Sequence, residues 1–367
     1  MRSPHKLTHF LILCTAIVIA SIAGYAQVAA SSTVQVSDQK AGSILVFPFY
    51  GSDGTTANDT RISITNVGPS GVNPQLSMGT ISNSLNVHLF WLDGASCSQA
   101  DGYICFTKFQ QWILKASDWD PVTPRGVLIA VAVDNMGYPI AYNGLIGNAF
   151  VNCNVTQNGI TEKWLDNYGA EAFAGVGIPS GNLGFIYPDI NSFTAGASTS
   201  TLFFNNGPLN FLAGYDAGAN SFAVEFQSTK DAVGQTVLTV GLDGTIGGAL
   251  DGNGVENNRI AAIYRADEKL YSWTGGGGGC QVLLRLTDNN PRIVGGLGTQ
   301  IGTGKTGTMV WTTIAASGRA GAVGLFITPN SNNNIRVGIR GLHKRDVATL
   351  VNTSRLIMPV FMPVCVI

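Results

Sequence analysis

Short apolar segments separated by turn residues recur along the chain, and several of them alternate apolar and polar positions with a period of two, which is typical of half-buried β-strands. The segment LNVHLFWL (85–92) has an apolar residue at every second position. The segment GVLIAVAV (126–133) is apolar on both faces and predicts a strand in the centre of its sheet. Further strands are expected at 43–50, 61–67, 103–106 and 108–114. Together they predict an immunoglobulin-like antiparallel β-sandwich over residues 40–155.

The second half of the chain repeats this pattern, with loops rich in Gly and Asn. Strands are expected at 183–188, 200–205, 222–228, 236–242, 259–265, 269–273, 280–286, 306–316 and 322–328. They predict a second β-rich domain, a sandwich or a barrel-like sheet, over residues 181–367. The predicted fold class is therefore all-β.

Residues 156–180 are expected to form a short helical connector between the two domains. Thr161 can cap a helix there, and Trp164, Leu165, Tyr168 and Ala172 would share one face of it. Earlier in the chain, SDWDP (117–121) predicts a sharp corner, because Ser and Asp favour local side-chain hydrogen bonds and Pro stops a strand.

The first residues have the order of a secretory signal peptide. A short basic start precedes FLILCTAIVIASIA (10–23), and small residues follow. We expect residues 1–26 to be removed, or residues 1–30 if the later of two small-residue sites is used. The apolar run is shorter than the roughly 20 residues that span a bilayer, so an uncleaved anchor is the less favoured interpretation. The mature protein is therefore expected to be secreted or periplasmic, or to lie at the cell surface, with no membrane span after processing.

Five of the six cysteines remain after such processing, and in an extracytoplasmic protein they are expected to form disulfides. Cys97 and Cys105 bracket a turn, so we expect them to pair. Cys280 with Cys365 is the second expected pair, and Cys153 is left over as a free thiol. The sequence does not fix this connectivity, because Cys153 could replace any of the partners.

Composition excludes several classes of function. Only 12% of the 367 residues are charged and the net charge is −1, so there is no basic surface for nucleic acid. With 45% hydrophobic residues the chain is not disordered. We therefore expect a folded protein with no nucleic-acid partner.

Candidate metal and catalytic groups are sparse. Oxygen ligands gather at Asp243, Asp251, Asn253 and Glu256, which are the calcium candidates. The spacing of a calcium loop is incomplete, and tight turns use the same residue types. The glycine-rich segment 296–307 lacks the spacing of a nucleotide loop, so no other cofactor is expected. The sequence has no G-x-S-x-G motif, and the mature chain offers only His88 and His343 as histidine bases, so no catalytic residue is assigned.

The six tryptophans offer an alternative function. Exposed on one face, several of them could stack on sugars in a carbohydrate-binding or carbohydrate-cleaving module. Most lie in apolar strands, where core packing is the favoured interpretation, and Trp119 is the one expected outside.

Several phrases of the sequence occur together in a known group. KAGSILVFPFY, RISITN, VHLFWLDGASC, ASDWDP, IAVAVD, GAEAFAG, NNPRI, GLHK and IMPVFMPVC resemble a group of uncharacterised secreted bacterial β-rich proteins. The resemblance covers most of the mature chain and implies a bacterial extracytoplasmic protein, without implying an activity or any site residue. Related sequences often have a cysteine soon after the IAVAVD strand; here Cys153 comes later, which leaves its pairing open.

These observations favour a non-enzymatic extracytoplasmic structural, adhesion or assembly protein. Its expected partners are a cell-surface or extracellular protein or a glycan, with self-association through exposed edge strands. The alternating segment SSTVQVSDQK (31–40) could supply an added strand.

Overall fold

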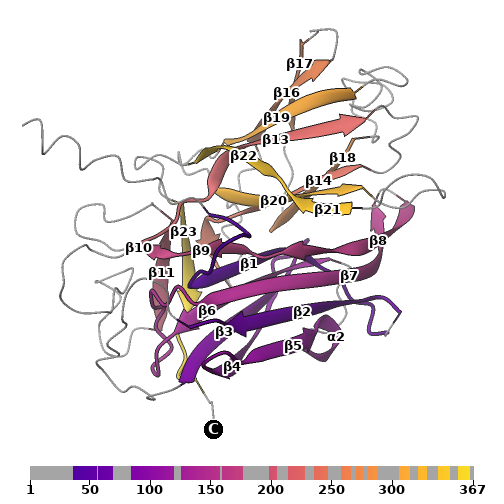
Figure 1. The fold of residues 1–367 in the computed structure, drawn as a ribbon. Helices are drawn as coiled ribbons and strands as arrows, with labels where there is room; N and C mark the ends of the chain where they lie inside the picture. Colours follow the sequence, from indigo (N-terminus) through magenta and orange to yellow (C-terminus); the bar gives the residue numbers. More distant parts are fainter. Residues whose placement is uncertain are drawn as a thin grey trace, which may run out of the picture. The chain divides into compact units, whose positions relative to one another are not determined.

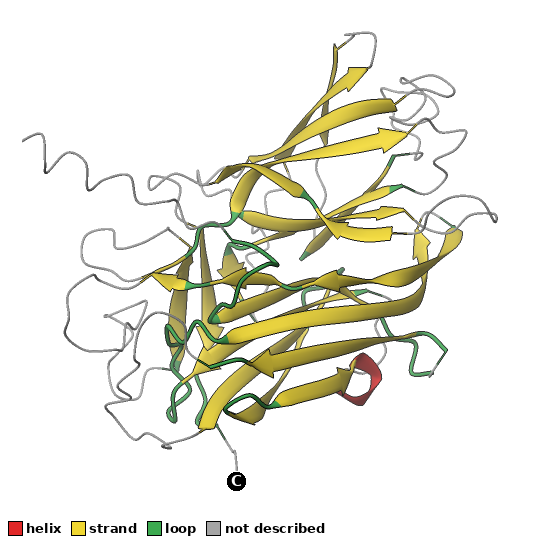
Figure 2. Ribbon diagram, viewed as in Figure 1, coloured by secondary structure: helices red, strands yellow, loops and turns green. Residues whose placement is uncertain are grey.

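The computed structural model shows an almost entirely β protein in which the described residues contain a single one-turn helix, α2 (Ala116–Trp119) (Figure 2). The structure describes residues 36–55, 57–68, 84–119, 125–157, 159–176, 198–204, 214–227, 235–246, 258–265, 270–275, 280–286, 306–314, 321–328, 338–347 and 354–363. The all-β fold class is confirmed, whereas the predicted signal peptide lies outside the described residues.

The described residues form four sheets, and the first of them, sheet 1, contains most of the strands predicted near the start of the chain (Figure 1). Its order is β4 (Gln99–Thr107), β3 (Ser84–Asp93), β6 (Gly126–Val133), β1 (Ile44–Tyr50) and β9 (Glu171–Phe173). β6 lies between β3 and β1, and every residue of β6 is buried. The prediction of a central strand at this position is therefore confirmed.

Sheet 2 has the order β5 (Gln111–Lys115), β2 (Asp59–Asn66), β7 (Leu145–Gln157) and β8 (Ile160–Gly169). All three strand pairs are antiparallel. Burial alternates along β2, with Ile62 and Ile64 inside and Arg61 outside, because one face of the sheet packs on the core and the other faces solvent.

Sheets 1 and 2 pack face to face as a β-sandwich. The rings of Phe49 on β1 and Trp164 on β8 lie 4.7 Å apart, and the Tyr168 hydroxyl donates to the Phe49 carbonyl oxygen. A side chain at Gly147 would meet the ring of Phe47, so this glycine allows the close approach of β7 to β1. The immunoglobulin-like topology stays a prediction.

The helical connector predicted for residues 156–180 is wrong where the chain is described, because β8, β9 and β10 (Gly175–Val176) occupy that region. Trp164, Tyr168 and Ala172 are all buried, but residues four apart share a face in a strand as well as in a helix. Leu165 distinguishes the two structures: a helix would bury it with Trp164, whereas here it is exposed.

The later strands form two further sheets. Sheet 3 has the order β10, β12 (Gly214–Tyr215), β11 (Thr199–Phe204), β23 (Ser354–Pro359) and β15 (Gly244–Thr245). Sheet 4 has the order β17 (Leu270–Gly275), β16 (Asn258–Arg265), β19 (Thr306–Ile314), β13 (Ala219–Gln227), β20 (Ala322–Thr328), β14 (Thr236–Gly241) and β18 (Gln281–Arg285). β21 (Gly338–Gly341) also pairs with β20, and β22 (His343–Val347) with β13.

The predicted boundary at residue 155 falls inside β7, so it does not separate two domains. One hydrophobic cluster includes residues from all four sheets, among them Phe47, Val151, Leu202 and Leu238. A second, smaller cluster lies within sheet 4 around Phe222. The two sequence halves therefore share a core.

Polar contacts reinforce this joint core. Arg285 on β18 pairs with Glu162 on β8, and the Lys344 ammonium lies 2.6 Å from the Glu171 carboxylate. The main-chain N–H of Ile339 donates to Asp166 at 2.8 Å. Burial raises the pKa of Glu171, and Lys344 offsets only part of this rise. Loss of Lys344 would remove the hydrogen-bonded partner of this buried acid and destabilise the fold.

Candidate functional site

The candidate functional site is the edge of sheet 2 formed by β5 (Figure 1). Among the described residues, β5 pairs with β2 alone, from Thr65 opposite Gln111 to Arg61 opposite Lys115. An edge strand presents one row of main-chain N–H and C=O groups that its own sheet does not use. This strand was predicted as 108–114, and the structure begins it at Gln111 because a turn occupies 108–110.

The direction of these main-chain groups follows from the ladder. The N–H of Asn66 donates to the carbonyl oxygen of Gln110 at 2.9 Å, so Gln110 faces β2. In an antiparallel pair, consecutive residues alternate between facing the partner and facing away. The N–H and C=O groups of Gln111, Ile113 and Lys115 therefore point away from β2.

Apolar side chains lie along the same edge. Phe109 is 68% exposed, Ile113 is 60% exposed and Trp112 is 37% exposed. Lys108 and Lys115 flank them, and the Lys108 ammonium lies 5.0 Å from the centre of the Phe109 ring. Exposed aromatic and aliphatic groups beside unused main-chain groups form a surface suited to binding an added strand.

The turn before β5 holds Phe109 outward. Phe109 has a φ of 64°, which is uncommon for a residue with a side chain. The N–H of Gln110 donates to the Thr107 carbonyl oxygen at 3.2 Å, and the N–H of Thr107 donates to the Gln110 side chain at 2.8 Å. These bonds fix the turn and compensate for the unfavourable backbone conformation at Phe109.

The neighbouring edge of sheet 1 is covered instead of open. The indole N–H of Trp112 donates to the carbonyl oxygen of Cys105 on β4 at 2.8 Å. A side chain at Gly102 on the same strand would meet the ring of Trp119, so Trp119 lies over that part of β4. Trp119, expected outside, is half-buried against Trp91. This contrast makes β5 the better candidate for binding.

His88 lies in a second chemical cluster on β3. Its Nε2 is 2.9 Å from the Asp101 carboxylate, and its ring stacks on Tyr103 with centres 4.1 Å apart. The Tyr103 hydroxyl donates to the Phe361 carbonyl oxygen at 2.7 Å. Burial lowers the pKa of His88, and the hydrogen bond and charge of Asp101 act in the opposite direction. The side chain of His88 is fully buried, so this group packs the protein interior and offers no open base.

The calcium candidates are not brought together among the described residues. Asp243 accepts the main-chain N–H of Arg355 at 3.1 Å, which positions the loop after β14. Asp251, Asn253 and Glu256 lie outside the described residues. Within the described part of the chain, no group of three or more His, Cys, Asp or Glu side chains could hold a metal ion.

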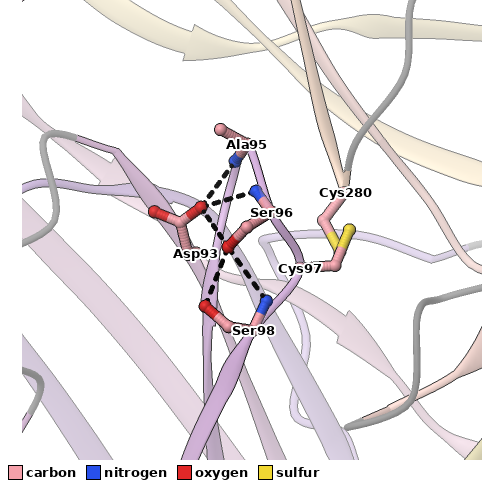
Figure 3. The surroundings of a disulfide bond; sticks show 6 residues. All are labelled: Asp93, Ala95, Ser96, Cys97, Ser98 and Cys280. Carbon is pink, nitrogen blue, oxygen red and sulfur yellow. Dashed lines mark hydrogen bonds between the residues drawn. A yellow bond between two sulfur atoms is a disulfide. The ribbon is translucent and has the colours of Figure 1, made fainter.

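The disulfide pairing differs from the expected one. Cys97, in the turn after β3, is bonded to Cys280, just before β18, with a Cα–Cα distance of 5.3 Å (Figure 3). The expected pairs of Cys97 with Cys105 and of Cys280 with Cys365 are therefore corrected. Asp93 explains the local geometry, because its carboxylate accepts the N–H groups of Ala95 and Ser96 and curls the turn so that Cys97 faces β18.

The other described cysteines have distinct states. Cys105 is also disulfide-bonded. Cys153 is free and buried on β7, and its thiol donates to the Gly51 carbonyl oxygen at 2.9 Å. Burial raises the pKa of Cys153, so it is not an activated nucleophile.

The tryptophans do not form a joint platform among the described side chains. Trp91, Trp164 and Trp311 are buried, as core packing predicts. Trp112 is partly exposed, but its indole N–H is bonded to β4 at the side of the sandwich. The local sequence pattern predicts a strand at β5. It does not predict that this strand lies at an edge, because strand order depends on contacts between residues far apart in the sequence.

Comparison with known proteins adds no family to this picture. No family model and no curated protein matches the chain. Among the helices of the described residues, none is long and apolar enough to cross a membrane. The site must therefore be interpreted from its own geometry.

Proposed function

We propose that this is a non-enzymatic extracytoplasmic structural, adhesion or assembly protein that binds its partner along the edge of β5. The observation that carries the proposal is the exposure of Phe109 and Ile113 beside main-chain groups that point away from β2. Folded proteins normally protect such an edge, so an open apolar edge supports a binding role. Lys108 and Lys115 at its ends would limit unspecific aggregation.

Export is part of the proposal and has two supports. The N-terminal segment has the order of a signal peptide, and the chain contains a disulfide between Cys97 and Cys280. The resemblance to secreted bacterial proteins agrees with this location. The expected partner is an extracellular or cell-surface protein.

The test compares retention of purified protein on intact cells of the source organism. The double variant Phe109→Ser/Ile113→Lys removes the apolar edge, and we expect it to lose at least about tenfold in retention, which corresponds to ~1.4 kcal/mol. Leu270→Lys is the matched control, because Leu270 is 58% exposed on β17 at the edge of sheet 4. Equal retention of all three proteins, or none for the unmodified protein, would reject the proposal. A melting curve of each variant checks that it folds.

Carbohydrate binding is a second candidate, favoured by the outer face of sheet 2. Asn148, Phe150 and Asn152 alternate along β7 on the side away from the core, and the Arg61 guanidinium lies 5.5 Å from the centre of the Phe150 ring. Amide groups beside an aromatic ring are typical of sugar contacts. A glycan array would support this candidate if Phe150→Ala abolished a signal that the Phe109→Ser/Ile113→Lys variant retained.

A further inference from the structure

Building on the proposed function, we propose that the partner of the β5 edge is β5 of a second copy of this chain. The two strands would pair antiparallel about a two-fold axis that passes through Ile113. The pairing would extend sheet 2 across the contact and give an isologous dimer, in which both copies use the same surface.

The direction of the main-chain groups limits the possible registers to axes that pass through a residue. Gln111, Ile113 and Lys115 point their N–H and C=O groups outward, and two outward residues must lie opposite each other to exchange both hydrogen bonds. An axis through Ile113 places Ile113 opposite Ile113 of the second copy and Gln111 opposite the second copy's Lys115. An axis through Trp112 or Leu114 would also pair outward residues, but it would place Ile113 opposite Gln111 or Lys115 of the second copy. An axis that passes between two neighbouring residues would place a residue with outward main-chain groups opposite one whose groups face β2.

The side chains favour the axis through Ile113 over the other two. Ile113 meets its own copy, so the most exposed apolar residue of the strand lies at the centre of the contact. Gln111 lies opposite Lys115, so no lysine of the strand faces another lysine, and like charges directly opposite would destabilise the pair. The contact therefore has an apolar centre and polar ends, as interfaces commonly do.

The flanking charges are complementary as well. Lys108 lies five positions before Ile113 and Asp118 lies five positions after it, and both are exposed. The two-fold axis brings the Lys108 end of one copy to the Asp118 end of the other at both ends of the contact. Because Asp118 belongs to the one-turn helix α2, this attraction acts beside the strand pairing and not within it.

The decisive experiment changes charge at Gln111, which is exposed in the single chain. Gln111→Glu would place an acid opposite the second copy's Lys115 at two symmetric positions. Each cross-strand charge pair contributes about 0.2–1 kcal/mol, so we expect the dissociation constant to fall by about 2- to 30-fold. Gln111→Lys would place a lysine opposite the second copy's Lys115 and should raise the dissociation constant by a similar factor.

The double variant Gln111→Lys/Lys115→Glu restores opposite charges across the axis and should recover dimerisation. Sedimentation equilibrium over a wide concentration range measures all four proteins. A monomer at every concentration, or a dimer indifferent to these charges, would overturn the inference. If the protein stays monomeric while Phe109→Ser/Ile113→Lys still loses cell retention, the proposed function stands and only the identity of the partner is wrong.

Discussion

At the scale of single residues, His88 couples the fold to pH. Its folded-state pKa lies below the value of about 6.5 expected in the unfolded chain, so the folded protein binds the proton less readily. The contribution of neutral His88 is then complete above about pH 6.5. As pH falls below this value the stability decreases by at most ~1.4 kcal/mol per pH unit, until the pH passes the folded-state pKa.

We therefore expect the free energy of unfolding to fall between pH 7.5 and 5 in the unmodified protein and to fall less in His88→Phe, which keeps an aromatic ring against Tyr103 but does not titrate. Urea unfolding at a series of pH values measures the difference. His343→Gln is the control, because it removes the exposed histidine of β22 and keeps His88. An equal slope in His88→Phe and the unmodified protein would show that other groups produce the pH dependence.

At the scale of elements, the turn between β6 and β7 is shaped to receive the C-terminal segment. Gly137 has a φ of 89°, and a side chain there would lie 1.9 Å from the carbonyl oxygen of Phe361. The same oxygen accepts the Tyr103 hydroxyl. Gly137 is therefore required both for the left-handed backbone and for the contact with Phe361.

Gly137→Ala should lower stability by more than Gly159→Ala does. Gly159 has a φ of 78° but nothing within 4 Å of the added carbon, so it measures the backbone strain alone, about 1 kcal/mol. Only Gly137→Ala should also speed cleavage by chymotrypsin at Phe361, because it displaces that residue. The measurements are urea midpoints and digestion rates, and equal effects of the two substitutions would contradict the expected contact.

Individual strands could be predicted from local pattern where that pattern is unambiguous. β1, β3 and β6 follow the predicted ranges closely. Each apolar run is short and has turn residues on both sides, so it does not fit a helix. β8 could not be distinguished from a helix, because Trp164 and Tyr168 fit both periods. The open edge of β5 could not be predicted at all, since it depends on the order of strands in the folded sheet.

At the scale of the whole molecule, the segment at β18 links sheet 4 to sheet 1. Beside the Cys97–Cys280 disulfide, the Gln281 side-chain amide donates to the carbonyl oxygens of Pro48 at 2.6 Å and Gly126 at 2.8 Å. These two carbonyls lie at the irregular part of the pairing between β1 and β6. One short segment thus joins sheet 4 to sheet 1 covalently and satisfies buried polar groups at the same point.

The identity of the Cys105 partner follows from the same long-range connections. Cys97 and Cys280 bind each other, Cys153 is free, and removal of a signal peptide would delete Cys14. The described chain ends at Pro363, and Phe361 already contacts Tyr103, two residues from Cys105 on β4. Cys365 is therefore the expected partner of Cys105.

Peptide mapping without reduction should therefore find Cys97 linked to Cys280 and Cys105 linked to Cys365. Forming each bond removes two protons and two electrons from two thiols, which a disulfide-containing oxidoreductase outside the cytoplasm can accept. Cys153 should react with iodoacetamide only after unfolding, because burial raises its pKa and hides the thiol. A Cys97–Cys105 link, or labelling of Cys153 in the folded protein, would contradict this arrangement. If this arrangement holds, two disulfides between residues far apart in the sequence join the two halves of the chain. This explains why local sequence patterns predict two domains where the contacts form a common core.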